Sequence, residues 1–474
     1  MNEQLINKLD EALASKCKQK DVPGMAIMVA KDGVPIYKNN YGFRDVDKQL
    51  PVTEDTIFPA ASVTKSFSTL SIMILADQRK LSPEDLVIDW LPELKLPGGK
   101  YENELKIRHL LSNSGGFPGL GAVNRARAES IQNDPDGEHM ANRLSYDIHG
   151  APIQTVEELM EIMSVEFNYR LLGKPGTTYN YSNEGFALLQ EIIERASKQS
   201  FPEFVQKHIF DPLKMTHSTF LVQDLNNYER ITEIYGYKEG FKSFHSPVWW
   251  NVGKIYTNGS LKTTVIDLIK YLELYRQNGT VNGEKIISAD VLKQMITPQI
   301  DVPTGEKYGY GLKLSTYKGI SLVGHPGVIK GGSAYVMVAE ELGLTFAVLT
   351  NIGEFSAEGL ALTALNVIAE LPDAPTKKEI DPLSRTELET YTGQYLSAEG
   401  RNIEVTLQGE QLQLTARNSQ AFIEPVAEDT FVTTDGAKFK FLRFENGEIA
   451  GVFTGFRFVP KANSRSEAVH VVLL

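Results

Sequence analysis

The sequence predicts an α/β protein in which helices flank an antiparallel sheet, with an all-helical insert and a C-terminal antiparallel β-barrel. Strand-like apolar runs lie near both ends of residues 1–371, and the residues between about 60 and 305 show mostly helical periodicity. Beyond them, short alternating stretches separated by turn residues follow a proline-rich segment, which predicts the barrel. We therefore expect a domain at residues 1–371, a linker at 372–386 and a barrel domain at 387–474.

The elements of the first domain follow in chain order. Leu5, Leu9 and Leu13 recur at helical spacing in a charged segment, which predicts an amphipathic N-terminal helix. An Asp-Gly turn between two short apolar runs then predicts a hairpin. The expected strands span residues 25–30, 36–41, 308–314, 320–323, 333–339 and 344–350, and a helix is expected at about 356–370.

The barrel is predicted from period-2 texture after a segment rich in proline and charge at residues 371–383. Gly409, Asp435-Gly436 and Asn446-Gly447 mark turns between its strands. The expected strands span residues 403–407, 411–415, 421–425, 439–444 and 449–453.

Composition excludes several classes of protein. A net charge of −12 spread along the chain argues against a nucleic-acid surface. No window approaches the roughly 18 apolar residues of a membrane span, and the charged start is unlike a secretory signal, so we expect a cytoplasmic protein. The single cysteine, Cys17, excludes an intrachain disulfide and a cysteine-rich metal site.

The segment Ser62-Val-Thr-Lys65 is one of three Ser-x-x-Lys matches, the others beginning at Ser15 and Ser315. Only Ser62 follows an Ala-Ala turn and opens a strongly apolar helix, on which Lys65 would share its face. The helix N-terminus suits an oxyanion, and a lysine in an apolar pocket can act as a base. A helix cap with a solvated lysine is the alternative for this segment alone.

A second candidate is Tyr181-Ser-Asn183, which follows a Pro-Gly turn and precedes a helical segment at 185–196. A tyrosine on such a loop can relay a proton, and an asparagine amide can hold a substrate amide. The alternative is a capping loop in which Ser182 or Asn183 caps the helix.

The third candidate is Gly-His325-Pro-Gly327, the only His-x-Gly of the chain. It lies just ahead of a predicted buried strand, where Gly327 would let a substrate backbone approach closely. The alternative is a loop histidine whose hydrogen bonds are satisfied within the protein.

These three elements, in this order, resemble the penicillin-recognising serine hydrolases, with a Ser-x-x-Lys helix, a loop motif and a strand motif. The branch is that of the class C β-lactamases and serine peptidase family S12, with D-aminopeptidase, esterase and penicillin-binding protein relatives. Residues 107–116, Ile-Arg-His-Leu-Leu-Ser-Asn-Ser-Gly-Gly, support the resemblance, which covers about residues 8–370. The tail from residue 388 looks like the lipocalin-like barrel appended to some members.

The resemblance implies the β-lactamase/transpeptidase-like fold and acyl transfer through a covalent ester on Ser62. Lys65 and Tyr181 would share the serine proton, and which of them is the base stays open. Backbone N–H groups of Ser62 and Val328 would hold the oxyanion.

Asn183, His325 and Gly327 would bind the substrate, a small peptide, amide or ester. No metal or organic cofactor is expected, and a homo-oligomer is left open.

One departure from the family pattern bears on substrate choice. His325 stands where many β-lactamases and carboxypeptidases carry lysine, and a mostly neutral imidazole holds a carboxylate less firmly. The expected activity is therefore a peptidase of the D-aminopeptidase or penicillin-binding protein type. A carboxylesterase, a weak β-lactamase, an acyl transferase and a catalytically silent ligand-binding or scaffold member are the alternatives.

Two further regions are left with two interpretations each. Residues 119–155 are longer than the family core needs, and they fit a surface loop as well as a lid over the substrate. Trp249, Trp250 and Tyr256 could wall an apolar pocket or serve packing alone.

Overall fold

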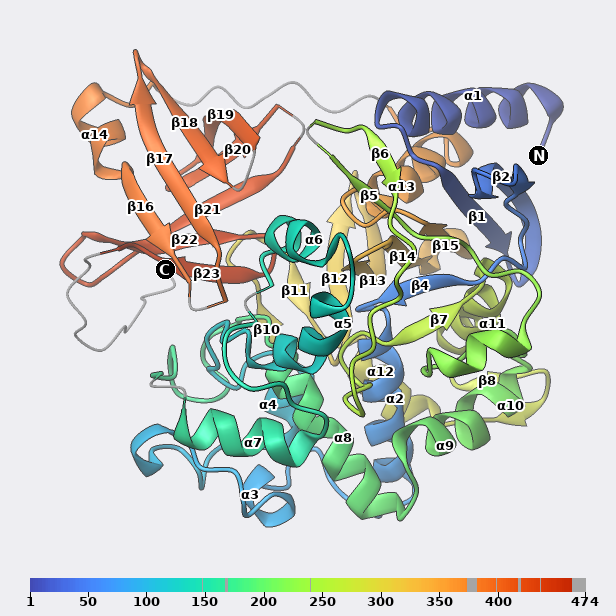
Figure 1. Cartoon of the computed structure of the whole chain (residues 1–474), viewed down its shortest axis with the longest axis horizontal. Helices are drawn as coiled ribbons and strands as arrows, with labels where there is room; N and C mark the ends of the chain where they lie inside the picture. Colours follow the sequence, from blue (N-terminus) through green and yellow to red (C-terminus); the bar gives the residue numbers. More distant parts are fainter. Residues whose placement is uncertain are drawn as a thin grey trace.

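The computed structural model describes the chain except residues 147, 167–168, 239, 373–381, 398, 417–418, 435 and 463–474. A nine-stranded sheet in the order β10-β11-β12-β13-β14-β15-β1-β2-β3 forms the centre of the first domain, and all of its paired strands are antiparallel (Figure 1). The predicted fold class is confirmed. The strands are β1 (Gly24–Lys31), β2 (Val34–Asp45), β3 (Leu50–Pro51), β10 (Ile300–Asp301), β11 (Lys307–Tyr308), β12 (Lys313–Tyr317), β13 (Ile320–Ile329), β14 (Gly332–Ala339) and β15 (Leu344–Thr350).

The sheet joins segments from both ends of the domain, because β1 pairs with β15 and Met25 lies opposite Thr350. One expected strand, at residues 308–314, is wrong as a single element and is divided between β11 and β12. Between them the backbone N–H groups of Tyr310 and Gly311 donate to Met295 and Leu111 instead of to a strand, and Gly311 has a φ of 66°.

Helices cover both faces of the sheet. On one face α1 (Glu3–Gln19) and α13 (Ala357–Ile368) bury Leu9, Leu13 and Leu360 against it. The other face carries the helical insert. Its helices include α3 (Val87–Trp90), α4 (Ile107–Leu111), α5 (Ala128–Gln132), α6 (Gly137–Leu144), α7 (Val156–Val165), α8 (Asn183–Ser197), α9 (Phe201–Val205), α10 (Asp211–Leu213), α11 (Val265–Arg276) and α12 (Ala289–Met295).

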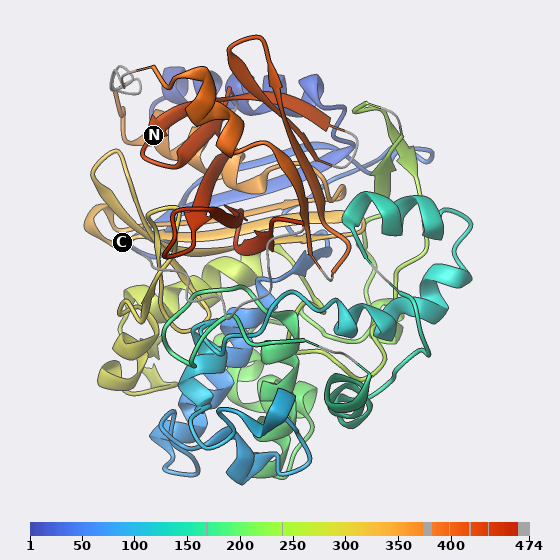
Figure 2. The same ribbon diagram turned by 90° about the vertical axis from the view of Figure 1, so that its left-hand side faces the viewer.

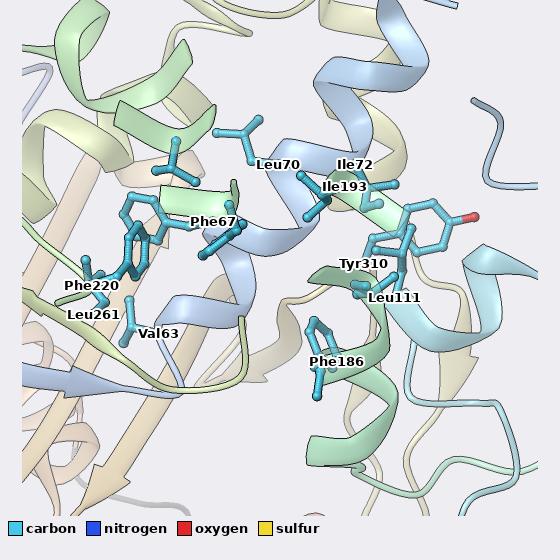
Figure 3. Packing of buried hydrophobic residues seen from close by; sticks show 14 of the residues in the cluster. Val63, Phe67, Leu70, Ile72, Leu111, Phe186, Ile193, Phe220, Leu261 and Tyr310 are labelled. Atoms are coloured by element: carbon cyan, nitrogen blue, oxygen red, sulfur yellow. The ribbon is translucent and has the colours of Figure 1, made fainter. Parts of the chain in front are cut away.

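Helix α2 (Thr64–Asp77) runs through the centre of this insert. Every residue from Thr64 to Leu75 is buried, and apolar side chains of its neighbours surround it (Figure 3). The hydroxyl groups of its serines are hydrogen-bonded to backbone carbonyl oxygens, as Ser66 and Ser71 donate to Val63 and Phe67. A helix buried on all sides holds its N-terminus rigidly in place, and this is the end next to Ser62.

Short two-stranded elements complete the first domain. Strand β4 (Phe58–Ala61) leads into α2 and pairs with β7 (Leu261–Thr263). The others are β5 (Tyr235–Tyr237) with β6 (Ser243–His245) and β8 (Thr280–Val281) with β9 (Glu284–Lys285).

The C-terminal part is a helix followed by a nearly closed eight-stranded antiparallel barrel in which each strand pairs with the next. A bridge between Tyr395 and Lys461 brings the first strand beside the end of the last. Most of the expected linker, residues 373–381, lies outside the described residues. The elements are α14 (Arg385–Thr390), β16 (Gly393–Leu396), β17 (Asn402–Gln408), β18 (Gln411–Ala416), β19 (Ser419–Ala427), β20 (Thr430–Thr433), β21 (Lys438–Arg443), β22 (Ile449–Thr454) and β23 (Arg457–Pro460).

The barrel lies beside the β10–β12 end of the sheet (Figures 1 and 2). An apolar cluster is shared between the two parts: Tyr179 and Tyr308 of the first domain pack with Phe453 and Phe458 of the barrel. The barrel is therefore joined to the first domain by a buried surface as well as by the chain.

Candidate active site

Ser62 lies at the junction between β4 and α2. It is the one residue between Phe58 and Leu75 that is not fully buried. The preceding residue, Ala61, has a φ of 48°, a left-handed conformation that is costly for any residue with a side chain. Strained residues of this kind cluster at functional sites, where the surrounding fold holds them in place. The turn brings Ser62 out of a segment that is otherwise enclosed.

Strand β13 approaches this turn closely at Gly327. A Cβ atom added there would lie 2.3 Å from the carbonyl oxygen of Ala60 and 3.1 Å from the backbone nitrogen of Ser62. Only glycine permits this approach, which brings the backbone of residues 327 and 328 beside that of Ser62. Val328 follows with half of its side chain exposed, at 50%.

Lys65 extends from the first turn of α2 toward Ser62. Its Nζ lies 3.3 Å from Ser62 Oγ, 2.8 Å from Asn183 Oδ1 and 2.5 Å from the carbonyl oxygen of Asn258. Lys65 is fully buried. Lys65 Nζ therefore lies within hydrogen-bond distance of Ser62, its predicted partner, and of the Asn183 side chain.

Burial holds the pKa of Lys65 well below its usual range. The positive charges of Arg457 and Arg127 lower that pKa further, in that order, while Glu184 opposes them. A lysine in this environment carries a neutral amine over a wider range of pH than a solvated one.

Tyr181 completes the group around Ser62. Lys65 Nζ lies 4.7 Å from the centre of the Tyr181 ring. Burial raises the pKa of Tyr181, and its hydrogen bond with Ser62 lowers that pKa only in part. The phenol therefore keeps its proton near neutral pH.

The segment at residues 112–116 positions the loop that carries Tyr181. Asn113, with a φ of 55°, accepts from the backbone N–H of Asn180 at its carbonyl oxygen and from that of Ser182 at Oδ1, at 2.9 and 3.0 Å. Ser182 then caps α8 through Gly185. Asn183, the first residue of that helix, is thereby directed toward Lys65.

The barrel forms the other side of this loop. The backbone N–H of Tyr181 donates to the carbonyl oxygen of Phe456 at 3.0 Å, and that of Phe458 donates to Asn180 Oδ1 at 2.8 Å. Arg457, between those two barrel residues, places its Cζ 4.8 Å from the centre of the Tyr181 ring. The β22–β23 hairpin is thus part of the site.

Arg457 shares one carboxylate of the barrel with a second arginine. Its Nε lies 3.0 Å from Glu399 Oε1, and the Nε of Arg401 lies 2.9 Å from the same oxygen. Glu399 also contacts the segment at residues 119–155, because a Cβ atom at Gly119 would lie 2.7 Å from its carboxyl carbon. The Tyr181 loop, the barrel and the 119–155 segment therefore meet next to Tyr181.

His325 lies within β13 and is 1% exposed. Its Nδ1 is 2.6 Å from the carbonyl oxygen of Pro326, which requires Nδ1 to carry the proton. Nε2 then accepts from the hydroxyl of Tyr308 at 3.0 Å. Burial, with a smaller contribution from Lys65, lowers the pKa of His325 to about 3, so the ring is neutral and both of its nitrogens are engaged.

Residues 119–155 are held against the site by a buried ion pair. Asp134 accepts from Lys330 and, at 2.7 Å, from Trp250 Nε1. Lys330 directly follows β13. Trp249 and Trp250 line a hollow beside Ser260 and Leu261 near the turn at Ser62, and Tyr256 packs on the main core.

Sequence reasoning did not identify four charged residues around Ser62 and Tyr181: Glu184, Arg127, Arg457 and Glu399. Glu184 directly follows Asn183, and that adjacency was a usable signal. The other three reach the site through tertiary contacts; the bond between Phe458 and Asn180 spans 278 residues. Within the described residues no group of three or more His, Cys, Asp or Glu side chains is arranged to hold a metal ion.

Comparisons with known proteins match the two parts of the chain separately. The family model described as Beta-lactamase matches residues 3–369, and the model described as a domain of unknown function, DUF3471, matches residues 377–465. None of the helices in the described residues is long and apolar enough to span a bilayer.

Two curated relatives show the extent of similarity. Protein flp of Staphylococcus aureus strain MW2 is 25% identical over 346 residues, which cover 73% of this chain but only 63% of the relative. The chain thus spans less than two thirds of that protein's length. Penicillin-binding protein 4* of Bacillus subtilis strain 168 is 27% identical over 415 residues, 82% of each chain.

A solved structure covers the barrel as well. The octameric penicillin-binding protein homologue from Pyrococcus abyssi is 27% identical, with a TM-score of 0.68 over 96% of this chain and 100% of that one.

Proposed function

Because the chain belongs to the Beta-lactamase family of serine hydrolases, we propose that it cleaves amide or ester bonds through an acyl-enzyme, with Ser62 as the nucleophile. The observation that carries this proposal is the environment of Lys65 Nζ, which lies 3.3 Å from Ser62 Oγ in a fully buried position. A nucleophile and a base within reach of each other, at a strained turn, form the arrangement that covalent catalysis requires.

Lys65 is the better candidate for the base. A neutral amine has two hydrogens and one lone pair. The oxygens of Asn183 and Asn258 accept the two hydrogens, so the lone pair is left for the Ser62 hydroxyl. The lowered pKa of Lys65 favours the neutral amine, whereas the raised pKa of Tyr181 disfavours the phenolate that a tyrosine base would need.

Tyr181 is then a proton donor. In the first step Ser62 Oγ attacks the substrate carbonyl carbon while its proton passes to Lys65. Tyr181, which lies beside Lys65, protonates the leaving group and is reprotonated from Lys65. Water then attacks the ester carbonyl, and the proton moves in the opposite direction, from water through Tyr181 to Lys65 and from Lys65 to Ser62 Oγ. This step releases the acid and restores Ser62.

Backbone N–H groups of Ser62 and Val328 would stabilise the oxyanion. The close approach of Gly327 to the Ser62 nitrogen supports this pairing, because it brings the end of β13 beside the nucleophile turn. Asn183 would orient the substrate amide, and Gly327 would give the substrate backbone room.

The substrate we propose is a small peptide or amide, as for peptidases of the D-aminopeptidase or penicillin-binding protein type. The names of the Bacillus and Pyrococcus relatives support this class, and the octameric state of the latter supports a homo-oligomer. A carboxylesterase is the second candidate. The neutral, fully engaged His325 favours it, because His325 supplies no charge for a carboxylate-terminated substrate.

A serine-directed fluorophosphonate probe tests the proposal. We expect one adduct on the wild-type protein by intact mass, located on Ser62 by peptide mapping, and none on Ser62→Ala. Ser315→Ala is the matched control, since it removes the serine of another Ser-x-x-Lys segment and should label like the wild type. A wild-type protein that does not label would favour the catalytically silent ligand-binding or scaffold alternative.

A further inference from the structure

Arg127 is a buried cation without an ion-pair partner in the described part of the chain. It ends a short 3₁₀ helix, Ala122–Arg127, within the 119–155 insert, and is 5% exposed. Its Nε has no hydrogen-bond partner, and its guanidinium lies over the ring of Tyr146 at 5.4 Å. No carboxylate of the described residues pairs with it.

Three other enclosed or partly enclosed cations of the described residues are each paired with an acid. Lys330 pairs with Asp134, Arg457 with Glu399, and Arg143 of the same insert with Glu354. An enclosed charge that lacks such a partner is costly, so it favours the binding of an anion. Arg127 differs from these three cations because no such acid pairs with it.

Arg127 lies close to the groups that are proposed to react. The helix that carries Arg127 is attached to the Tyr-x-Asn loop, because the backbone N–H of Val123 donates to Glu184, the neighbour of Asn183. The positive charge of Arg127 contributes to lowering the pKa of Lys65. It also contributes to lowering that of Lys262, on the strand paired with β4. These two lysines flank the Ser62 turn. Tyr146, over whose ring the Arg127 guanidinium lies, packs on Trp250 with 6.0 Å between the ring centres, and Trp250 lines the hollow beside Ser260. Arg127 therefore lies on the side of residues 119–155 that borders this hollow.

We propose that Arg127 binds a carboxylate of the substrate, which would give the enzyme a preference for substrates with a free carboxylate group. This rests on the proposed function and deepens it. The neutral His325 cannot supply the charge, and a guanidinium offers paired N–H donors that match a carboxylate. Recognition of the carboxylate would come from the insert instead of from β13.

The test compares matched substrates that differ by one charge. In the first pair the carboxylate lies on the leaving group: N-acetyl-D-alanyl-D-alanine and its C-terminal amide. In the second pair it lies on the acyl group: 4-nitrophenyl hydrogen succinate and its methyl ester. We expect the wild-type kcat/KM to favour the charged member of one pair, and that pair identifies the side on which Arg127 binds.

Arg127→Gln should reduce that preference on the order of tenfold, the effect of losing one charge-assisted contact. Arg127→Lys should keep part of the preference, because the positive charge remains while the paired N–H donors of the guanidinium are lost. Arg143→Gln is the matched control: it removes another arginine of the same insert, one paired with Glu354, and should keep the wild-type preference.

Three results would overturn the inference: no preference in the wild type for the charged member of either pair, the same preference in both Arg127 variants as in the wild type, or an equal loss in Arg143→Gln. Failure of the proposed function is distinguishable, since then neither charged nor neutral substrates would form an acyl adduct on Ser62. An adduct from the neutral substrates without any charge preference would reject the role of Arg127 alone.

Discussion

The guanidinium of Arg457 lies 4.8 Å from the centre of the Tyr181 ring, although the two residues belong to different domains. Next to this contact the backbone N–H of Tyr181 donates to the carbonyl oxygen of Phe456, and Lys65 Nζ lies 4.7 Å from the centre of the same ring. A charge supplied by the barrel therefore acts directly on the groups that would move the serine proton.

Replacing Arg457 with glutamine should move the acidic limb of the pH–rate profile to higher pH. Lys65 must be neutral to act as a base, and the positive charge of Arg457 helps to keep its pKa low. Without that charge the pKa of Lys65 rises, so the amine is protonated over a wider range of acidic pH and kcat/KM falls there.

The measurement is kcat/KM against pH with a neutral ester. Arg443→Gln is the control, because Arg443 is a barrel arginine paired with Asp429 and outside the site. A limb that stays in place in Arg457→Gln, or that moves equally in the control, would contradict the prediction.

Lys65→Ala and Tyr181→Phe should each remove most activity, on the order of 10³-fold or more, and the double variant should lose little beyond either one. Lys65 contacts Ser62 and lies on the Tyr181 ring, so removing either side chain already disables the proton path. Single-turnover acylation rates for the four proteins test this. Losses that multiply in the double variant would mean that the two residues act independently.

Lys330→Met should destabilise the protein by about 3–5 kcal/mol, because it leaves Asp134 buried and charged beside Trp250. Adding Asp134→Leu should recover a large part of that loss, since no charge is then left enclosed. Urea unfolding monitored by tryptophan fluorescence measures both. If the double variant is less stable than Lys330→Met, the pair contributes more than charge balance.

Removing the barrel by ending the chain at residue 371 should abolish most activity and lower the melting temperature. The cut takes away the partners of Tyr181 and Asn180 and exposes Tyr179 and Tyr308, now packed against Phe453 and Phe458. Calorimetry and ester hydrolysis on the truncated protein provide the test. A fragment as active and as stable as the full chain would show that the contact is incidental.

Some of this site could be predicted from the sequence because its geometry is local. Three residues along a helix place Lys65 over Ser62, and an apolar run predicts a buried helix beneath them. The pairing of β1 with β15 could be expected from strand patterns at both ends of the domain. Periodicity reports which face of an element is buried, and these features need no more than that.

The remainder depends on how distant segments pack. Nothing near Arg457 indicates a tyrosine on another domain, and nothing near His325 indicates that Tyr308 engages its Nε2. The expected strand at residues 308–314 failed for a similar reason, since Met295 and Leu111 accept the backbone hydrogen bonds of its central residues. Hydrogen-bond partners across a domain interface leave no periodic trace in a sequence.

The hairpin at residues 449–460 also determines when the enzyme becomes competent during its synthesis. A ribosome makes the Ser62 helix long before it makes the hairpin residues that border Tyr181. Domains generally fold as they emerge, so the first domain can be compact while its site is still open on one side. Nascent chains, and products of premature termination before the hairpin, would therefore be poor hydrolases even with Ser62 and Lys65 in place.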